Sequence, residues 1–520
     1  MASNPLADDD VFERLKRPAD PEILKEREKA VKERVRAQYE KYQKRLAELV
    51  QDNSTLPVHI RSIHVDGAKN TRRGFLKKVF EPVLSKEKQE GYTLETAMRE
   101  LQKATGRLHQ FEIFHPNISI SLDTPPQPLL SANEALKLPT PLDVILLVKE
   151  RPRLTLKSGT DFGNTEGTGY VTLFTRNLLG GADILSLSAS TGTRTRSAYD
   201  AYFHAPLFSN PDLCAFAAAY ATSRSNHDFA SHEQVDKGGR VGLSWVTPGN
   251  RDRHELCYEG VCRAITELSS DASESIRSDA GKSFKSAIRY SFTRDWRDNP
   301  LLPSRGYLFK TSLELAGKLN LGGGVHHVKT ESEFQFSTPL IPHTPTPPSS
   351  SKLRTYLHHS TLTTTLRTGL LYPLTAEPTR FPDRFRLGGP TSLRSFRESG
   401  LGPHDGRDAL GGDLYLATCT SLLLPIPHVG PDKPIRFQMY LNGGRLLAWD
   451  RGMRGGVDIP EVLRRVFGNA AGWPSTSAGV GFVYAHSVAR VEVNFGVPLV
   501  IREGERARKG FQFGLGISLM

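Results

Sequence analysis

The sequence predicts a mainly β protein, a 16-stranded antiparallel transmembrane β-barrel that follows one small α+β domain. Three observations support this prediction. Between residues 153 and 520 the chain repeatedly alternates apolar with small or polar side chains, as strands with one face in lipid do. Residues 53–152 combine strand and helix periods, and residues 1–52 are polar and charged. The expected parts are an N-terminal arm (1–52), a small domain (53–152) and a barrel (153–520).

The composition is compatible with a membrane protein only if strands cross the bilayer. The 520-residue chain is 38% hydrophobic, with a mean hydropathy of −0.38. No apolar run approaches the roughly 18 residues that a membrane helix needs. The net charge of +12 is spread over strands and turns, so nucleic-acid binding is not expected. The four cysteines are too few for a disulfide scaffold and are expected to be free thiols.

The N-terminal arm begins with an acidic segment and continues as a charged helix. The first 20 residues lack the features of a secretory signal and of a transit peptide, so synthesis in the cytosol is expected. From Pro21 to about Val50, widely spaced apolar residues among Glu, Lys and Arg predict a long helix. This helix is either a solvated arm with internal ion pairs or a docking helix for a partner.

The small domain is expected to have the order β-α-α-β-β. Thr93 is a helix-capping residue and Gly106 follows the second helix. The expected elements are a strand at 58–65, helices at 71–83 and 93–105, a second strand from 109–114 and 117–122, and a third at 143–150. This order, with Val65-x-Gly67-x-x-x-Thr71 after the first strand, resembles a polypeptide-transport-associated (POTRA) domain.

The barrel segment contains sixteen stretches with a period of two, an even number that suits an up-and-down barrel. They are 153–162, 168–177, 183–192, 198–206, 213–223, 239–247, 254–266, 284–293, 306–317, 325–337, 353–371, 413–425, 435–449, 477–485, 489–498 and 510–519. Charges lie on one face only. In 490–495 the odd positions are apolar and the even ones are Arg, Glu and Asn, and Lys310 and Glu314 oppose Phe309. A Lys or Arg facing lipid would cost about 2–4 kcal/mol near the midplane.

The last strand carries the clearest amphipathic pattern of the chain. Apolar residues alternate with small or polar ones from Gln512 to Leu519. A barrel needs such a complete final strand so that closure leaves no edge in lipid. The spacing polar-x-Gly-x-x-apolar-x-apolar, carried by Gln512, Gly514, Ile517 and Leu519, resembles the sorting signal of mitochondrial outer-membrane barrels.

A turn between the eighth and ninth segments carries a long ordered motif. Its Asp, Pro and Gly residues are typical of a turn, and Arg–Asp pairs can hold it together. It closely resembles the D-x-R-D-x-P-x-x-P-x-x-G hairpin of the outer-membrane barrel-assembly superfamily. The matching residues are Asp295, Arg297, Asp298, Pro300, Pro303 and Gly306.

The long loop around residues 386–397 provides a second motif. In the same superfamily an apolar-Arg-Gly-aromatic tip folds back into the barrel. Leu393, Arg394 and Phe396 match this tip, but Ser395 replaces the glycine, which makes the tight backbone turn uncertain.

The arginine of the loop tip needs a carboxylate partner inside a barrel. Glu492, on the luminal face of a late strand, is the candidate partner. Relatives often place an acid at the position of Asn442, and this second departure favours Glu492.

Together these features resemble the channel subunits of the mitochondrial sorting and assembly machinery over about residues 53–520. The resemblance implies a multi-pass protein of the mitochondrial outer membrane that inserts and folds β-barrel precursors, with its POTRA domain in the intermembrane space. It implies contacts with the lipid bilayer, with unfolded β-barrel precursors and with peripheral metaxin-like subunits on the cytosolic side. Other outer-membrane barrels and intermembrane-space chaperones are further candidate partners.

Pairing of the first and last strands would close such a barrel. The last strand is short and contains glycine, so this seam is expected to be weak and to open as a lateral gate. An opened edge could accept a precursor strand by β-augmentation, without nucleotide or cofactor. The expected gate residues of the first strand are Leu154, Thr155, Leu156, Lys157 and Ser158.

No enzymatic or metal-binding motif was found. G-x-S-x-G, H-E-x-x-H and P-loop patterns are absent from the sequence, and neighbouring histidines such as His326 and His327 point to opposite faces of a strand. Three alternatives remain. A translocation channel of the same superfamily would usually carry more POTRA domains, a small-solute porin would lack the POTRA segment and arginine loop, and a soluble β-rich binding protein would need no detergent.

Overall fold

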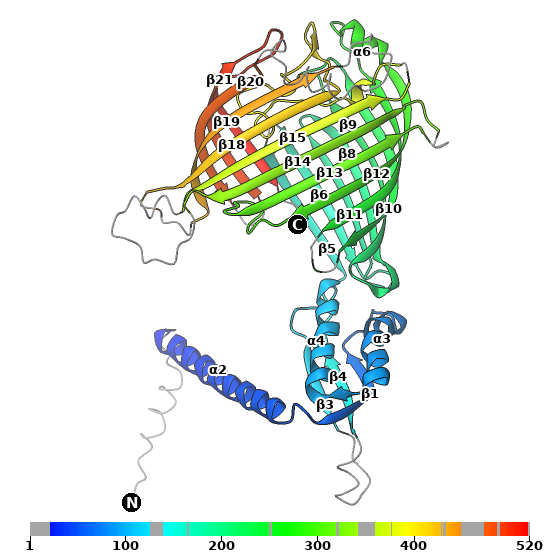
Figure 1. Cartoon of the computed structure of the whole chain (residues 1–520), viewed down its shortest axis with the longest axis vertical. Coiled ribbons are helices and arrows are strands. Elements are labelled where there is room, and N and C mark those ends of the chain that lie inside the picture. The colour runs from blue at the N-terminus through cyan, green and yellow to red at the C-terminus, as the bar shows by residue number, and fades with distance from the viewer. Residues whose placement is uncertain are drawn as a thin grey trace, which may run out of the picture. The chain divides into compact units, whose positions relative to one another are not determined.

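The computed structural model describes residues 21–124, 139–163, 166–247, 249, 252–318, 322–341, 359–375, 377–427, 429, 433–448, 473–485 and 489–517 (Figure 1). The chain divides into two compact units. One comprises residues 1–69 and 76–150, and the other comprises residues 70–75 and 151–520. No described helix is both long and apolar enough to cross a membrane.

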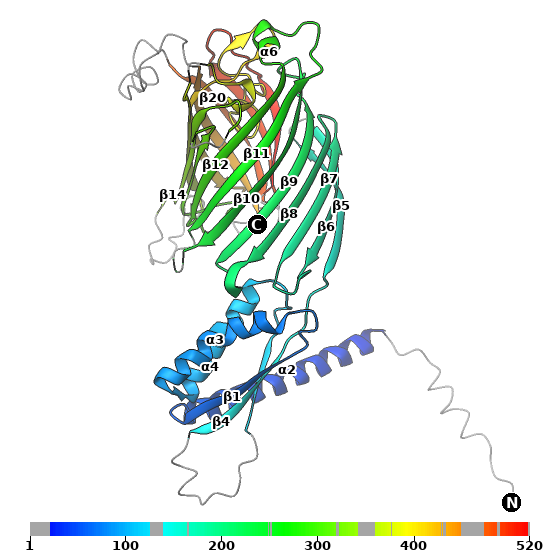
Figure 2. The same ribbon diagram turned by 90° about the vertical axis from the view of Figure 1, so that its right-hand side faces the viewer.

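The first unit is a small mixed sheet with two helices packed on it (Figure 2). The sheet order is β2-β1-β4-β3, in which β1 and β4 are parallel and the other pairs are antiparallel. Its core is formed by Val58, Phe80, Leu101, Leu108 and Val144. The elements are α2 (Pro21–Asp52), β1 (Pro57–Asp66), α3 (Arg73–Glu90), β2 (Tyr92–Thr93), α4 (Leu94–Gln110), β3 (Ser119–Asp123) and β4 (Thr140–Leu147).

The predicted cap of α4 is present, but the predicted end of the helix is wrong. Thr93 Oγ1 accepts from the Thr96 amide at 3.4 Å, and Thr96 Oγ1 accepts from the Thr93 amide at 2.8 Å. The helix continues past Gly106 because Leu108 extends its buried stripe. Residues 109–111 of the expected strand are therefore helix and turn, and Phe114 alone of that stretch forms an isolated antiparallel bridge, with Glu150. Strand β3 begins only at Ser119.

The third strand of this unit, β4, is also displaced from its predicted position. It runs over 140–147 instead of 143–150, because it pairs with β1 from Thr140 onward. In helix α2, the widely spaced apolar side chains Val31, Val35, Tyr42 and Leu49 are exposed.

The second unit is a 16-stranded antiparallel sheet, which confirms the predicted number of strands. Sequential strands pair throughout, from β5 at one end to β22 at the other. The strands are β5 (Leu154–Gly163), β6 (Glu166–Arg176), β7 (Ile184–Gly192), β8 (Thr195–Pro206), β9 (Leu213–Ser225), β10 (Glu233–Val246), β11 (Arg253–Thr266), β12 (Gly281–Asp295), β13 (Gly306–Ala316), β14 (His327–Pro339), β15 (Thr361–Pro373), β18 (Leu414–Pro425), β19 (Ile435–Leu447), β20 (Ser475–Ala485), β21 (Ala489–Val500) and β22 (Gly510–Ile517).

Two strand boundaries differ clearly from the prediction. Strand β10 begins at Glu233, six residues before the predicted 239, and β15 is described from Thr361, whereas its predicted start at 353 lies outside the described residues. The two faces of the sheet are chemically distinct. Val493 and Phe495 are exposed on the outer face, and Glu314 is buried on the inner one.

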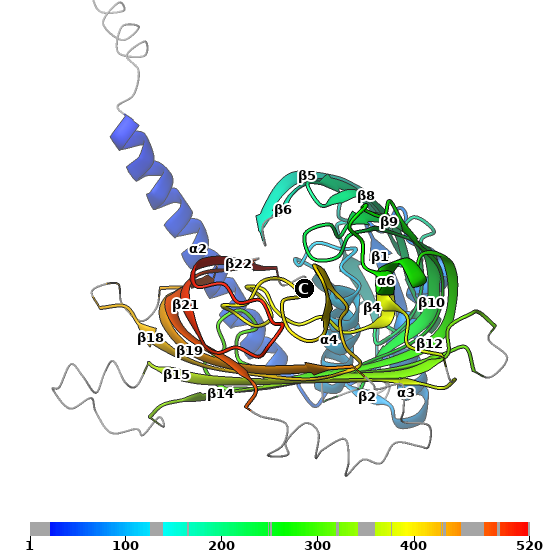
Figure 3. The same cartoon turned by 90° about the horizontal axis from the view of Figure 1, so that it is seen from above.

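The space enclosed by the sheet contains the long segment between β15 and β18. Seen from above, this segment lies inside the ring of strands (Figure 3). It carries a short 3₁₀ helix, η2 (Phe381–Asp383), and a two-stranded ribbon of β16 (His404–Asp405) and β17 (Asp408–Ala409). Its apolar side chains form a buried cluster with the inner wall, which comprises Leu371, Phe385, Leu387, Leu393, Phe396, Leu401, Tyr415, Ala417 and Leu446. We call residues 374–413 the luminal loop.

Candidate functional site

The two ends of the sheet, β5 and β22, face each other across a seam without pairing. β5 is registered only with β6 and β22 only with β21 among the described residues. The two strands nevertheless approach each other (Figure 3). As far as it is described, β22 has eight residues, fewer than any other of the sixteen strands. Within the described residues, no ladder of backbone pairs joins β5 to β22.

The predicted gate residues lie on these two strands. Leu154 and Leu156 are 63% and 67% exposed, and Phe511 and Phe513 on β22 are 72% and 50% exposed. Of the other predicted gate residues on β5, Thr155 is half-buried, and Lys157 and Ser158 are exposed. On the last strand, Gln512 and Gly514 are buried and Ile517 ends β22. The predicted signal residue Leu519 lies outside the described residues.

The tip of the luminal loop is attached to the wall through Arg394. Its Nη2 and Nε donate to Glu492 Oε2 on β21 at 2.6 and 3.1 Å, and both side chains are only 12% exposed. The guanidinium also lies over the ring of Tyr440, 4.9 Å from its centroid. A buried, doubly hydrogen-bonded ion pair of this kind is costly to break on one side. Glu492 was the partner expected from the sequence.

The serine that replaces the family glycine does not prevent the tight turn. Ser395 adopts a φ of 69°, in the left-handed region that normally favours glycine. Space for its side chain comes from Gly496 on β21, where an added Cβ would lie 2.0 Å from Ser395 Oγ. The chain therefore keeps the turn by placing a glycine opposite the serine.

The loop tip is bound to the last strand as well as to β21. The Ser395 amide donates to Gln512 Oε1 at 2.7 Å. Residues 506–508, which lead into β22, pair with residues 395–400 of the loop through three backbone hydrogen bonds: Arg397 N to Arg506 O, Arg506 N to Gly400 O, and Arg508 N to Ser395 O. These bonds place Phe396 opposite Ala507 in an isolated antiparallel bridge. The sequence suggested Gln512 only as a gate residue. The sequence does place the polar side chain of Gln512 on the luminal face, and this position could have indicated a contact with the loop.

Asn442 lies beside the loop tip but does not hold it. It faces Cys419 and Ser477 on the neighbouring strands. Arg394 Nη1 donates to Cys419 Sγ at 3.3 Å, and Ser477 Oγ donates to the Arg394 carbonyl at 2.7 Å. The Asn442 amide itself is buried and has no hydrogen-bond partner among the described residues.

A second anchor, which the sequence did not reveal, attaches the loop to the opposite side of the sheet. Arg263 on β11 donates to both oxygens of Asp383 at 2.6 and 3.0 Å, and Lys285 Nζ on β12 lies 3.8 Å away. Burial alone would raise the pKa of the Asp383 carboxyl, but these cations hold it below its usual range. Glu314 and His327 adjoin Asp383. The cluster is neutralised by arginine and lysine.

The family hairpin forms the turn between β12 and β13. Arg297 donates to both oxygens of Asp295 at 2.6 and 2.8 Å and to Gln335 on β14 at 2.8 Å. Asp298 accepts from the Ser304 hydroxyl and from the amides of Ser304 and Arg305. Burial alone would raise the pKa of this carboxyl, but these hydrogen bonds, the hydroxyl's first, hold it below its usual range. The remaining motif residues shape the backbone: Pro300 accepts from Arg297 at 3.2 Å, Pro303 is buried, and Gly306 has a φ of 103°.

One arginine links this hairpin to the loop anchor. Arg490 on β21 donates through Nη1 to the Leu301 carbonyl at 3.2 Å and through Nε to Glu492 Oε1 at 2.8 Å. The two family motifs are therefore connected through Glu492. Nothing in the local sequence around Arg490 indicated this connection.

Comparison with known proteins identifies the superfamily to which this architecture belongs. A model of the Omp85 superfamily domain matches residues 177–519. The structure titled "The crystal structure of BamA from Haemophilus ducreyi lacking POTRA domains 1-3" aligns with a TM-score of 0.67 at 15% identity, over 88% of this chain and 84% of that one. The fold is thus that of a 16-stranded outer-membrane β-barrel preceded by a POTRA-like domain.

Closer relatives refine the class. A SAM50-like protein of Schizosaccharomyces pombe is 36% identical over 493 residues, which cover 94% of this chain and 97% of that protein. The sorting and assembly machinery component 50 homolog of Bos taurus is 31% identical over 468 residues, covering 89% and 91%. The chain belongs to the SAM50 family, which is part of the Omp85 superfamily. Members of the SAM50 family are non-enzymatic β-barrel assembly factors of the mitochondrial outer membrane.

Proposed function

We propose that this chain inserts β-barrel precursors into the mitochondrial outer membrane through a lateral gate between β5 and β22. The observation that carries the proposal is that β5 and β22, the two ends of the sheet, are not paired with each other in the described part of the chain. In lipid, each backbone group without a hydrogen bond costs several kcal/mol. An incoming strand that pairs with either edge removes this cost, so β-augmentation and membrane burial drive insertion without a nucleotide.

The luminal loop supports the seam from inside in this mechanism. Its tip contacts β21 through Glu492 and β22 through Gln512. Because the loop and β22 share these contacts, movement of the last strand must strain or release the loop. The loop thereby fixes the position of one gate edge while the other edge pairs with substrate.

The POTRA-like unit lies in the intermembrane space in this proposal, where it meets precursors delivered by chaperones. The partners are the lipid bilayer, unfolded β-barrel precursors, other outer-membrane barrels and metaxin-like subunits on the cytosolic side. This assignment rests on the similarity to curated sorting and assembly machinery proteins over most of the chain.

A disulfide across the seam tests the gate. In a background without native cysteines, Leu156→Cys or Ser158→Cys is combined with Phe513→Cys or Leu515→Cys, and the pair that oxidises most completely is reconstituted in liposomes. The oxidised protein should lose insertion of a radiolabelled barrel precursor, measured by protease protection, and reduction should restore it. Full insertion with the bond formed would refute the gate.

A matched disulfide on the other side of β5 controls for the chemistry. Leu156 and Leu173 are registered partners in β5 and β6, so Leu156→Cys with Leu173→Cys forms a bond that leaves the seam open. Oxidation of this control should leave insertion unchanged. Loss of insertion in both proteins would indicate a general effect of rigidity and would also count against the gate.

The luminal loop is evidence against two alternative functions, that of a small-solute porin and that of a translocation channel. Its apolar cluster fills part of the lumen and is fastened at two walls. Ion conductance of the same liposomes distinguishes these functions, because an insertase with this loop should conduct weakly while it inserts precursor.

A further inference from the structure

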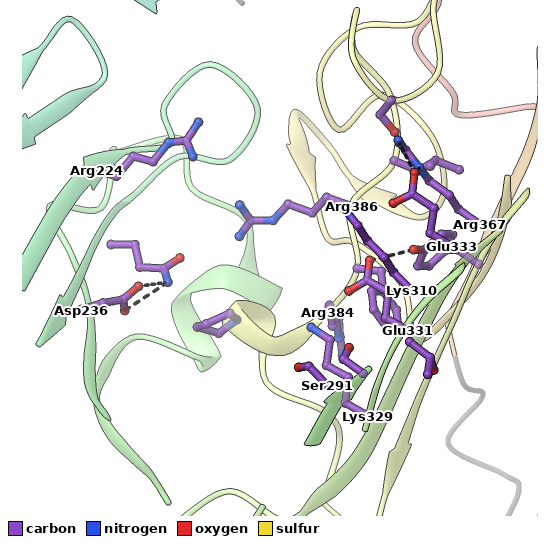
Figure 4. A pocket seen from close by; sticks show the side chains of 18 of the residues that line it. Arg224, Asp236, Ser291, Lys310, Lys329, Glu331, Glu333, Arg367, Arg384 and Arg386 are labelled. Atoms are coloured by element: carbon purple, nitrogen blue, oxygen red, sulfur yellow. Dashed lines mark hydrogen bonds and ion pairs between the residues drawn. The ribbon is translucent and has the colours of Figure 1, made fainter. Parts of the chain in front are cut away.

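The lumen contains a charged cavity beside the luminal loop whose chemistry the gate does not use. The cavity has a volume of about 880 Å³ and lies between β9, β10, β12, β13, β14, β15, β18 and the loop. Six cationic and three acidic side chains line it (Figure 4). In the two loop anchors, by contrast, every cation forms an ion pair with a carboxylate.

The three carboxylates of the cavity are already engaged. Tyr415 Oη donates to Glu331 at 2.8 Å, and Arg367 donates to Glu333 at 3.1 Å. Gln234 Nε2 donates to both oxygens of Asp236 at 2.9 and 3.2 Å. Of the three carboxylates, Glu333 alone accepts from a cation of the lining in these bonds, and the six cations outnumber the acids, so the lining keeps an excess of positive charge.

Arg386, in the luminal loop, carries part of this excess positive charge. Its guanidinium carbon lies 4.6 Å from the ring centroid of Phe381 and 4.8 Å from that of Phe229. Two rings of this kind hold a guanidinium by its faces and leave the in-plane N–H donors free. No carboxylate lies within ion-pair distance of Arg386 among the described residues.

The donors of Arg386 point across the cavity toward a second arginine. Figure 4 shows its guanidinium directed to the wall that carries Arg224 and Asp236. Burial, together with the charge of Arg224, lowers the pKa of Arg386 to about 10. Among the described residues, Arg224 has one ion pair, a long one of 3.7 Å to Glu398, and Glu398 also pairs with Arg194. The two arginines repel each other, and the carboxylates of Glu398 and Asp236 act against this repulsion at Arg386. An anion bound between the two guanidinium groups would add further attraction to both of them.

We propose that this cavity binds an oxyanion, of the phosphate or carboxylate type, between Arg386 of the luminal loop and Arg224 of β9. Planar guanidinium groups match the oxygen spacing of both anions and bind them bidentately. Lys310, an exposed cation of the lining, adds a longer-range attraction. Bound there, the anion bridges the loop to the wall formed by β9 and β10, which neither the Arg394 nor the Asp383 anchor reaches.

Phosphate binding to the full-length protein in detergent tests the site. Isothermal titration with inorganic phosphate, at constant ionic strength against chloride, should give saturable binding. Arg386→Met should weaken the affinity at least tenfold, and Arg386→Lys should weaken it less. Arg253→Met removes an exposed arginine outside the cavity and should change the affinity less than twofold.

A variant on the opposite wall keeps the test decisive if the loop loosens without Arg386. Arg224→Met leaves the two rings in place, removes one long ion pair to the loop, 3.7 Å to Glu398, and should also weaken phosphate binding at least fivefold. Wild-type affinity in both methionine variants, or no saturable binding by the wild type, would overturn the proposal.

Competition separates the two sources of the anion. A short peptide containing aspartate and glutamate, and its asparagine and glutamine counterpart, are titrated against bound phosphate. Displacement by the acidic peptide alone supports a polypeptide carboxylate as the ligand. Saturable phosphate binding that neither peptide displaces supports a free phosphate. Equal displacement by both peptides would overturn a charge-selective site.

Discussion

Arg394 and Glu492 join the tip of the luminal loop to the next-to-last strand through two hydrogen bonds, at 2.6 and 3.1 Å, in a nearly buried site. Ninety-eight positions separate the two residues in the chain. Their contact places the loop tip beside Gln512 of the last strand, whose amide oxygen accepts from Ser395. The loop anchor and the seam are thus one connected structure.

Glu492→Gln should loosen this anchor strongly. Removing one member of a buried pair costs about 3–5 kcal/mol, because the remaining charge is left without compensation. We expect a lower thermal midpoint in detergent and slower precursor insertion. Glu503→Gln, at an exposed carboxylate, is the matched control. Wild-type stability of Glu492→Gln would show that the pair does not anchor the loop.

Asn442→Asp should partly rescue Glu492→Gln. The side chain at 442 faces the strands that carry Cys419 and Ser477, both of which contact Arg394. A carboxylate there would supply a second partner for the guanidinium. The double variant should recover at least half of the lost thermal midpoint, and a further decrease would contradict this assignment.

Arg490→Met should release the hairpin between β12 and β13 from the loop anchor. The arginine is the link between the Leu301 carbonyl and Glu492. Hydrogen–deuterium exchange should become about tenfold faster for the peptide covering residues 297–305. The turn at 207–212 serves as an internal reference, and Arg490→Lys should have a smaller effect. Unchanged exchange in the hairpin would mean that the link carries no free energy.

The strands could be predicted because every second side chain must suit lipid, so the pattern is local. The same reasoning explains the error at β10. Its first residues, Glu233 to Gly238, pair in register with β9 but show no apolar alternation, because both faces of this stretch are polar. Helix α4 extends past Gly106 because the packing of Leu108 outweighs the glycine.

The candidate site was only partly predictable for the opposite reason. Arg394 could be predicted from a motif. Glu492 could be predicted because the polar residues of its strand alternate with apolar ones, which places its side chain on the luminal face. The pairing of Arg263 with Asp383 joins residues 120 positions apart, and neither has a local signal. Such contacts depend on the path of the luminal loop, which the alternation of strands does not encode.

Gly496→Ala should expel the loop tip from its place on β21. An added Cβ would lie 2.0 Å from Ser395 Oγ and 2.4 Å from Tyr440 Oη. Overpacking of this kind costs about 1–3 kcal/mol. Combination with Ser395→Gly and Tyr440→Phe, which remove both clashing oxygens, should restore most of the thermal midpoint. In the control Gly260→Ala the new Cβ would have only ordinary contacts, the nearest at 3.6 Å.

Acid should weaken the second loop anchor in a defined pH range. The pKa of Asp383 is lowered from 3.8 by Arg263 and Lys285, against the effect of burial. A carboxyl with a depressed folded-state pKa contributes its full stabilisation above its unfolded pKa, and this contribution is lost as the pH falls through the folded value. Asp383→Asn should therefore lower the thermal midpoint at pH 7 and flatten its decline below pH 4. Asp271→Asn, at an exposed aspartate, should follow the wild-type curve. Parallel pH profiles for wild type and Asp383→Asn would exclude Asp383 as an electrostatic anchor.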